Sequence, residues 1–365
     1  MPVFSSTSSL SGAPAKVLIV QTAFIGDVVL ATALVESVRH KWPDAAIDLV
    51  VIPKAANAVE NNPSLRRVIT FDKRRRHRRL VHLWRLTRKL RAERYDLALV
   101  PHRSLRSALL AWLAGIPQRV GFNRSAAPWL FHHRVAYRQK KHEVARNLDL
   151  LRPFGGGHEM PPKIYWTAED DKIVDEWLSK KTRQPRPLIA LAPGSVWPTK
   201  RWPQEYFEDL AWEISEHLGG LVALIGGPED AKLCERIRVA VGGACFSVAG
   251  QLTLRQTAAL LHRCALLISN DSAPTHLGVA AGCRVMTIFG STVPAFGFAP
   301  YDPDGDRHVI VEHALPCRPC TDHGRRHCPL GTLDCLKLIT PERVFAKVSE
   351  LLPRNAYAPS QTPAH

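Results

Sequence analysis

The sequence predicts an α/β protein with two domains, each built on a parallel sheet. Short apolar runs alternate with amphipathic segments of helical length along most of the chain, which is typical of strand–helix–strand units. Glycine-containing or polar turns follow several of the apolar runs directly, as they do at the carboxyl edge of open parallel sheets. The length of 365 residues also exceeds what one hydrophobic core usually supports. We therefore expect two α/β domains along the chain.

The first domain opens with a β–turn–α–β unit. Residues 16–20 form a predicted strand, residues 28–41 a helix and residues 47–52 a second strand, so the two strands should pair in parallel. Gly26 and Asp27 lie between the first strand and the helix, where open α/β sheets place their ligands. An Asp at this point is also common as a plain helix cap. The single glycine does not match the dinucleotide-binding fingerprint, which argues against a dehydrogenase.

Positive charge is concentrated in the first half of the chain. The net charge is +16, and residues 1–150 hold 26 basic and 10 acidic side chains, whereas residues 151–365 hold 23 of each. Residues 73–94 alone carry eleven basic side chains. One helical face of this segment is mostly apolar, with Leu80, Leu83, Trp84, Thr87 and Leu90.

The basic helix has a structural and a functional interpretation. Its apolar face is typical of a helix that packs on a sheet and leaves its other face in water. The excess of cations favours an anionic membrane surface or an anionic acceptor as partner. Nucleic acid is the competing partner, and the lack of a zinc finger, a recognition helix or an aromatic-interleaved basic sheet argues against it.

The rest of the first domain adds further arginines at a strand end. A strand is expected at residues 95–100, and Arg103 and Arg106 follow it, where they could form a fork for carboxylate or phosphate groups. Further elements are expected at residues 109–114 (helix), 119–121 (strand), 142–151 (helix) and 168–180 (helix), with a glycine-rich break at 153–157.

The second domain begins with a candidate phosphate-binding loop. Residues 188–192 form a buried strand that Pro193 and Gly194 end, and Ser195 and Lys200 follow before a helix that Pro203 opens. Backbone donors and the charge of Lys200 would together hold an anion. A plain strand–loop–helix connection with a surface lysine is the alternative interpretation.

Two more loops follow strands of the second domain. Asp271 and Ser272 lie after the strand at residues 265–269 and before a helix expected at 277–281, with His276 able to point the same way. The turn from Gly290 to Thr292 follows the strand at 285–289. Further elements are expected at residues 221–225, 245–248 (strands), 230–241, 254–263 and 341–352 (helices). The polar loops should therefore converge on one sheet edge.

We expect the protein in the cytoplasm, because the sequence offers no secretion signal. Residues 1–15 are Ser-rich and are interpreted as a disordered leader and not a signal peptide. No run approaches the ~18 apolar residues of a membrane span. Cys234, Cys245, Cys264 and Cys283 lie in apolar surroundings and are expected to be buried thiols in a reducing compartment.

Four more cysteines form a compact group. Cys317 and Cys320 have the CxxC spacing, and Cys328 and Cys335 follow in a loop that also contains three histidines. This spacing is compatible with a structural metal site, although the second pair is wider than in a zinc ribbon. Reduced thiols and a disulfide are the alternatives.

As a set, these loops resemble one enzyme family. Gly26-Asp27, the segment from Pro193 through Lys200 to Pro203, the segment from Asn270 to His276 and the turn from Phe289 to Thr292 look like the ADP-heptose:lipopolysaccharide heptosyltransferases. The resemblance covers about residues 16–352 and is strongest to the heptosyltransferase II type. Ala273 stands where the family usually has glycine, which would alter the approach of the backbone to the donor.

The resemblance implies the GT-B architecture, with two Rossmann-like, doubly wound domains facing across a cleft. The expected divisions are a disordered leader (1–15), an acceptor domain (16–160), a linker (161–186), a nucleotide-sugar domain (187–340), a helix (341–352) and a disordered tail (353–365). It further implies an inverting glycosyltransferase that moves heptose from ADP-L-glycero-D-manno-heptose to Kdo or heptose of the lipopolysaccharide inner core. Such an enzyme would be cytoplasmic and peripheral on the inner face of the cytoplasmic membrane.

The resemblance also suggests roles for individual residues. Asp27 would be the base and Lys200 would neutralise the leaving diphosphate. Nucleotide-sugar contacts are expected from Ser195, Glu229, Asp271, Ser272, Ala273 and His276. Acceptor contacts are expected from Arg103, Arg106 and Arg119. No cofactor is required in this scheme. The alternatives are the same fold with another nucleotide-sugar or acceptor, and a non-catalytic protein that binds anions or nucleic acid.

Overall fold

The computed structural model describes residues 12–72, 79–181 and 186–352. Part of the expected leader, the expected tail at residues 353–365 and the arginine-rich start of the basic segment at 73–78 lie outside the described residues.

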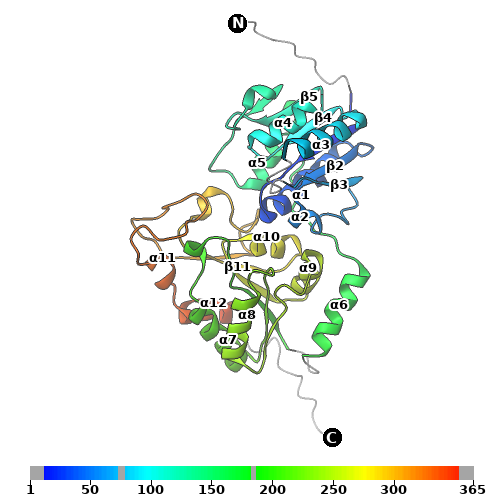
Figure 1. Cartoon of the computed structure of the whole chain (residues 1–365). Coiled ribbons are helices and arrows are strands. Elements are labelled where there is room, and N and C mark those ends of the chain that lie inside the picture. Colours follow the sequence, from blue (N-terminus) through cyan, green and yellow to red (C-terminus); the bar gives the residue numbers. More distant parts are fainter. Residues whose placement is uncertain (1–11, 73–78, 182–185, 353–365) are drawn as a thin grey trace. The chain divides into compact units, whose positions relative to one another are not determined.

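The chain divides into two units, each with its own six-stranded parallel sheet and helices (Figure 1). The first comprises Met1–Gln139 and Glu143–Pro162, and the second comprises Lys140–His142 and Lys163–His365. The α/β class predicted from the sequence is thereby confirmed.

The sheet of the first unit has the strand order β3-β2-β1-β4-β5-β6. Its strands are β1 (Lys16–Val20), β2 (Ala46–Val51), β3 (Arg67–Thr70), β4 (Leu97–Val100), β5 (Gln118–Phe122) and β6 (His133–Val135). β1 and β4 lie at the centre and are almost wholly apolar, because both of their faces are covered. The edge strands β3 and β6 contain exposed or half-buried polar residues and were not predicted.

Helices and short 3₁₀ turns cover this sheet. They are α1 (Ile25–Lys41), α2 (Pro53–Ala56), α3 (Arg79–Glu93), α4 (Leu105–Leu113), η2 (Pro128–Leu130), α5 (Glu143–Asp149) and η3 (Arg152–Phe154). α3, α4 and η2 pack together, and α1 packs against α5. The basic helix thus begins at Arg79 within the described residues. Thr87 and Leu90 on its predicted apolar face are buried, whereas Trp84 on the same face is 58% exposed, so that part of the prediction was wrong.

Two helices of the first unit begin earlier than expected. α1 starts at Ile25, three residues before the predicted start, because the Asp27 carboxylate accepts the Phe24 N–H at 3.2 Å across the first turn. α4 starts at Leu105 and not at 109, because Ser104 Oγ accepts the Ser107 N–H at 3.3 Å.

The sheet of the second unit has the equivalent order β12-β11-β10-β7-β8-β9. Its strands are β7 (Leu188–Ala192), β8 (Leu221–Leu224), β9 (Cys245–Ser247), β10 (Leu266–Asn270), β11 (Val285–Phe289) and β12 (Val309–Glu312). The strand order reverses between β7 and β10, and the carboxyl ends of these two strands are where such sheets hold ligands.

The helices of the second unit are α6 (Ala168–Ser179), α7 (Gln204–Leu218), α8 (Ala231–Val241), α9 (Leu254–His262), α10 (Ala273–Ala280), α11 (Asp334–Lys337) and α12 (Pro341–Leu351), with 3₁₀ turns η4 (Pro198–Lys200) and η5 (Pro294–Phe296). The prediction that α10 starts at 277 was wrong. The helix starts at Ala273, since Pro274 is compatible with the first helical turn.

No described helix is both long enough and apolar enough to span a bilayer. The helices instead bury apolar side chains against the sheets; α7 does so with Phe207, Leu210 and Ile214 beside the buried indole of Trp202.

Candidate active site

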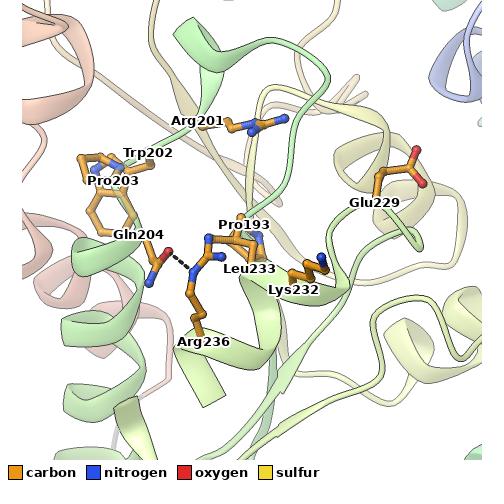
Figure 2. A pocket seen from close by; sticks show the side chains of 9 residues that line it. All are labelled: Pro193, Arg201, Trp202, Pro203, Gln204, Glu229, Lys232, Leu233 and Arg236. Atoms are coloured by element: carbon orange, nitrogen blue, oxygen red, sulfur yellow. Dashed lines mark hydrogen bonds between the residues drawn. The ribbon is translucent and has the colours of Figure 1, made fainter. Parts of the chain in front are cut away.

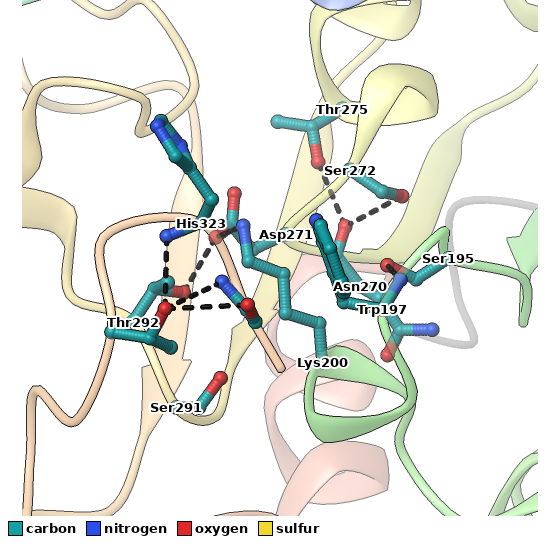
Figure 3. A network of polar contacts seen from close by, with 12 residues as sticks. Ser195, Trp197, Lys200, Asn270, Asp271, Ser272, Thr275, Ser291, Thr292 and His323 are labelled. Carbon is teal, nitrogen blue, oxygen red and sulfur yellow. Dashed lines mark hydrogen bonds and ion pairs between the residues drawn. The ribbon is translucent and has the colours of Figure 1, made fainter. Parts of the chain in front are cut away.

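At the carboxyl edge of the second sheet, a buried lysine forms an ion pair with a buried carboxylate. Asp271 directly follows β10, and its Oδ2 accepts hydrogen bonds from Lys200 Nζ at 2.5 Å and from Thr292 Oγ1 at 2.6 Å (Figure 3). The Lys200 and Asp271 side chains are only 13% and 7% exposed. η4, β10 and β11 thus each contribute one polar group to a single cluster.

The loop that carries Lys200 is fixed by its neighbours. The Asn270 amide donates to the Pro193 carbonyl at 2.9 Å, and its oxygen accepts the Trp202 N–H at 3.0 Å. Thr199 Oγ1 accepts the Arg325 N–H at 2.8 Å and the Ser291 hydroxyl at 3.1 Å. These hydrogen bonds hold the backbone before and after Lys200, so the position of the Lys200 Cα is fixed.

The start of α10 lies beside this cluster. Ser272 is the N-cap residue, and its side chain makes no capping hydrogen bond; its hydroxyl donates to the Asn270 carbonyl at 3.3 Å. The N–H groups at the start of a helix are suited to bind an anion. Ala273 occupies the first helical position. Its methyl group covers part of the backbone that a glycine at this position would leave open to a ligand.

His276 is buried one turn into α10. Burial lowers its pKa to about 4, with the nearby His142 adding to the effect and Asp271 opposing it, so the imidazole is neutral at pH 7. Its Nδ1 is buried and has no hydrogen-bond partner among the described residues. A neutral imidazole with one nitrogen unsatisfied is able to accept or donate one hydrogen bond to a ligand.

A pocket of about 390 Å³ lies where β7 and β8 lead into α7 and α8 (Figure 2). Arg201, Lys232 and Arg236 line it together with Glu229, and Arg236 donates to the side chain of Gln204 at 3.0 Å. Asp230 closes the neighbouring turn by accepting the Gly227 N–H at 3.0 Å. The pocket therefore offers cations and one carboxylate to a polar ligand.

In the first unit, Asp27 lies half-exposed in the first turn of α1. At the carboxyl ends of β1 and β4, His102 Nδ1 lies 3.0 Å from Thr22 Oγ1 and 2.9 Å from Ser107 Oγ. The Arg103 guanidinium lies over the Tyr137 ring, 4.1 Å from its centroid. Burial raises the pKa of Tyr137, and the negative charge of Asp27 adds to this increase.

The predicted acceptor arginines differ in their surroundings. Arg103 is part of the aromatic contact just described, and Arg106 is exposed in the first turn of α4. Arg119 instead donates to the backbone carbonyls of Leu130 (2.7 Å) and Ile116, and burial lowers its pKa. These bonds tie β5 to the segments before and after it.

Lys200, predicted to act in catalysis, pairs with Asp271, which was predicted for donor contact. Ser272, Ala273 and His276, also predicted for donor contact, lie in the first turn of α10 beside Asp271. Ser195 lies in the loop after β7, where its carbonyl accepts the Arg201 Nε–H at 2.7 Å, and Glu229 lines the pocket. Sequence reasoning did not single out Asn270 or the buried Glu143 and Arg146 of α5. Thr292 had been noted only as part of a small polar turn.

The eight cysteines all carry free thiols. Cys234, Cys245, Cys264 and Cys283 are buried, as expected, and burial raises their pKa values. Burial also raises the pKa of Cys335 to about 11, with Cys320, Cys328 and Cys317 contributing. Backbone N–H groups from Leu330 to Leu333 lower the pKa of Cys328. In the described parts of the chain, no three His, Cys, Asp or Glu side chains are grouped closely enough to hold a metal ion.

Comparison with known proteins agrees with this arrangement. A family model described as glycosyltransferase family 9 (heptosyltransferase) matches residues 83–330. Lipooligosaccharide heptosyltransferase 2 of Haemophilus ducreyi is 26% identical over 92% of this chain and 99% of its own length. Among solved structures, a family 9 glycosyltransferase from Veillonella parvula superposes with a TM-score of 0.80 at 25% identity, covering 93% of this chain and 97% of its own.

The E. coli ADP-heptose lps heptosyltransferase II superposes with a TM-score of 0.77 at 22% identity, covering 93% of this chain and 99% of its own. This likeness supports the fold. Together with the family model, which spans more than half of the chain, these matches establish the chain as a glycosyltransferase that belongs to family 9, the heptosyltransferase family.

Proposed function

We propose that the protein transfers heptose from ADP-L-glycero-D-manno-heptose to the inner core of lipopolysaccharide, with inversion at the anomeric carbon. The observation that carries this proposal is the Lys200–Asp271–Thr292 cluster beside the start of α10, in a chain of the heptosyltransferase family. The names of the relatives, heptosyltransferases of lipooligosaccharide and lipopolysaccharide, support heptose as the transferred sugar and lipopolysaccharide as the acceptor class.

In the proposed reaction, the Asp27 carboxylate accepts the proton of an acceptor hydroxyl as the oxygen attacks the anomeric carbon of the donor. A bond forms between that oxygen and the anomeric carbon, and the bond from this carbon to the diphosphate oxygen breaks. ADP leaves with the bonding electrons. One displacement on the face opposite the leaving group inverts the configuration.

The leaving diphosphate gains negative charge in the transition state, and Lys200 and the start of α10 would stabilise it. Lys200 carries its charge on a fixed backbone, so little reorganisation is needed. Asp271 holds the ammonium group in place and would accept hydrogen bonds from heptose hydroxyls. Ser195, Ser272, Ala273 and the unsatisfied Nδ1 of His276 would contact the diphosphate or sugar, and Glu229 the ribose.

For the acceptor, we assign the anion contacts to Arg103 and Arg106. Arg103 lies over Tyr137 near Asp27, and Arg106 is exposed, so each can reach a carboxylate or phosphate of the inner core. Arg119 was expected to share this role. Its two bonds to backbone carbonyls favour a structural role instead.

We place the enzyme in the cytoplasm, peripheral on the inner face of the cytoplasmic membrane. α3 supports this placement, because Trp84 is 58% exposed among exposed cations and Arg88 lies over its ring, 4.8 Å from the centroid. Sedimentation with vesicles tests the assignment. We expect binding to phosphatidylglycerol-containing vesicles, weak binding to phosphatidylcholine alone, and a loss on Trp84→Ser; equal binding to both vesicles would contradict it.

We propose that transfer needs no metal, because Lys200 supplies the positive charge. A metal at Cys317, Cys320, Cys328 and Cys335 would be structural, and in their present arrangement these thiols do not form a metal site. Metal analysis of the purified protein and assay after chelation test both statements. Transfer should continue at an unchanged rate in EDTA, and a rate that returns only on adding a divalent ion would contradict the proposal.

The donor and acceptor are tested by mass spectrometry of the products. ADP-heptose and ADP-glucose are each offered with lipid A acceptors that end in Kdo or in the first heptose. We expect the mass of one heptose to be added to one of these acceptors, from ADP-heptose only. Equal transfer from ADP-glucose would indicate the same fold with a different donor.

A further inference from the structure

A buried ion pair lies on α5, close to the candidate base but outside the residues used so far. Arg146 Nε donates to Glu143 Oε2 at 2.6 Å, and Arg146 Nη1 donates to the Gln139 carbonyl at 2.8 Å. The Arg146 side chain is fully buried and that of Glu143 is 7% exposed. Placing two charges out of water is costly, so an ion pair of this kind is weak evidence for a role in stability alone.

Tyr137 connects this pair to the sheet edge where Asp27 lies. The Arg146 guanidinium lies 4.9 Å from the centroid of the Tyr137 ring, and the Arg103 guanidinium lies 4.1 Å from the same centroid. α5 packs against α1, the helix that begins with Asp27. One acid, two guanidinium groups and a phenol thus form one cluster, in the unit whose helix α1 carries Asp27.

Asp27 and Glu143 interact electrostatically. Burial raises the pKa of Glu143 to about 7, and the negative charge of Asp27 acts in the same direction, while Arg146 and Arg103 oppose it. The interaction between two charges is mutual, so an ionised Glu143 also disfavours the negative charge on Asp27 and favours its protonated form.

We propose that Glu143 is a positioning residue for Asp27: its ionised carboxylate, held by Arg146, makes Asp27 a stronger base toward the acceptor hydroxyl. The inference rests on the proposed function, in which Asp27 accepts the proton. The charged and titratable groups around Glu143 are Asp27 from α1, Arg103 from the loop after β4, Tyr137, and Arg146 from its own helix.

The consequence is a step in the rate near neutral pH. Below this region Glu143 is protonated, and Asp27 works as a weaker base. Above it Glu143 is ionised, and Asp27 becomes the stronger base. A stronger general base accelerates proton transfer, so kcat/KM should rise by roughly three- to tenfold between about pH 6 and pH 8.

The test is the pH profile of kcat/KM for heptose transfer by the full-length protein and by Glu143→Gln. The Gln side chain has almost the same shape and can still accept from Arg146 Nε, but it cannot ionise. We expect the variant to lose the rise near pH 7 and to remain near the low-pH rate of the parent protein, with unchanged ADP affinity. Glu143→Asp should retain part of the rise.

A matched control is Glu36→Gln. Glu36 is also a buried carboxyl, but it lies on α1, where it accepts hydrogen bonds from the side chains of Asn62 and Ser64 at 2.9 Å each. It is not among the groups that shift the pKa of Glu143. Its variant should keep the profile of the parent protein. If Glu143→Gln does not fold, the double variant Glu143→Leu/Arg146→Met, which removes both buried charges of the pair, repeats the test.

Two results would overturn the inference. One is an unchanged rise near pH 7 in Glu143→Gln, and the other is a uniform loss at all pH values with a lower melting temperature, which indicates a purely structural role. Failure of the proposed function gives a different result, because Asp27→Asn would then still transfer heptose.

Discussion

Replacing Lys200 by Met should separate what this lysine does for the fold from what it does for the reaction. Lys200→Met removes the cation and keeps most of the side-chain volume. It leaves the Asp271 carboxylate, 7% exposed, with the Thr292 hydroxyl at 2.6 Å but without its countercharge. The variant therefore loses both an ion pair and the proposed stabiliser of the leaving diphosphate.

The two losses have different magnitudes. Removing one partner of a fully buried ion pair costs about 3–5 kcal/mol. The Lys200 side chain is 13% exposed and Thr292 still donates to Asp271, so we expect a loss of about 2–3 kcal/mol in unfolding free energy. Loss of an electrostatic stabiliser of the transition state lowers kcat by about 10²–10³-fold.

The double variant Lys200→Met/Asp271→Asn distinguishes these effects. Neutralising Asp271 removes the unpaired buried charge, so most of the lost stability should return in urea unfolding. Transfer should not return, because the cation is still absent. Lys172→Met is the control: Lys172 pairs with Glu169 at 3.5 Å on the surface, and its loss should change stability and rate little.

The reasoning would be refuted if Lys200→Met retained transfer within about threefold of the parent protein, or if the double variant recovered the rate together with the stability. The first result would mean that the diphosphate is stabilised elsewhere. The second would mean that Lys200 acts on the reaction only by keeping Asp271 folded in place.

Three further predictions follow from single contacts. Asp27→Asn should abolish transfer while leaving ADP binding intact by calorimetry, because the base is lost and the donor residues lie in the other unit; transfer at the parent rate would disprove the assignment. The pKa of His276, lowered to about 4 from 6.5, means that the folded state binds fewer protons than the unfolded chain between these values, so unfolding free energy falls by up to roughly 3 kcal/mol as the pH drops through that window. His276→Gln should therefore flatten the dependence on pH in urea unfolding between pH 6.5 and 4.5, and an unchanged slope would contradict this origin. Gly194→Ala should destabilise the second unit, because a Cβ at this position would lie 2.2 Å from Asp230 Oδ1; calorimetric melting at the parent temperature would show that the turn can move aside.

Central parts of the fold were predictable because they are buried on both faces. β1, β7 and β11 have the boundaries that their apolar runs predict, since a strand between two layers of helices must be apolar throughout. The edge strand β3 is partly exposed and polar, so its sequence resembles a loop. α10 was predicted four residues short because Pro274 was taken as part of a loop, although proline is compatible with the first turn of a helix.

The candidate site could be predicted as a set of residue types but not as a set of contacts. Lys200 and Asp271 were singled out separately, and their ion pair joins positions 71 residues apart, which no local pattern encodes. Glu143 and Arg146 are three residues apart on a helix, a spacing typical of surface pairs, and only the fold shows that they are buried. Arg119 was assigned to the acceptor for its charge, whereas it bonds to backbone carbonyls.

The central claim is that this family 9 chain moves heptose from its ADP donor onto an inner-core acceptor, and product analysis tests it most directly. Purified protein, ADP-heptose and a lipid A acceptor that ends in Kdo or in the first heptose are incubated, and the acceptor is weighed by mass spectrometry. The account predicts a gain of one heptose with the parent protein and none with Asp27→Asn. Acceptors of unchanged mass with every donor, or a heptose gain that Asp27→Asn still produces, would contradict it.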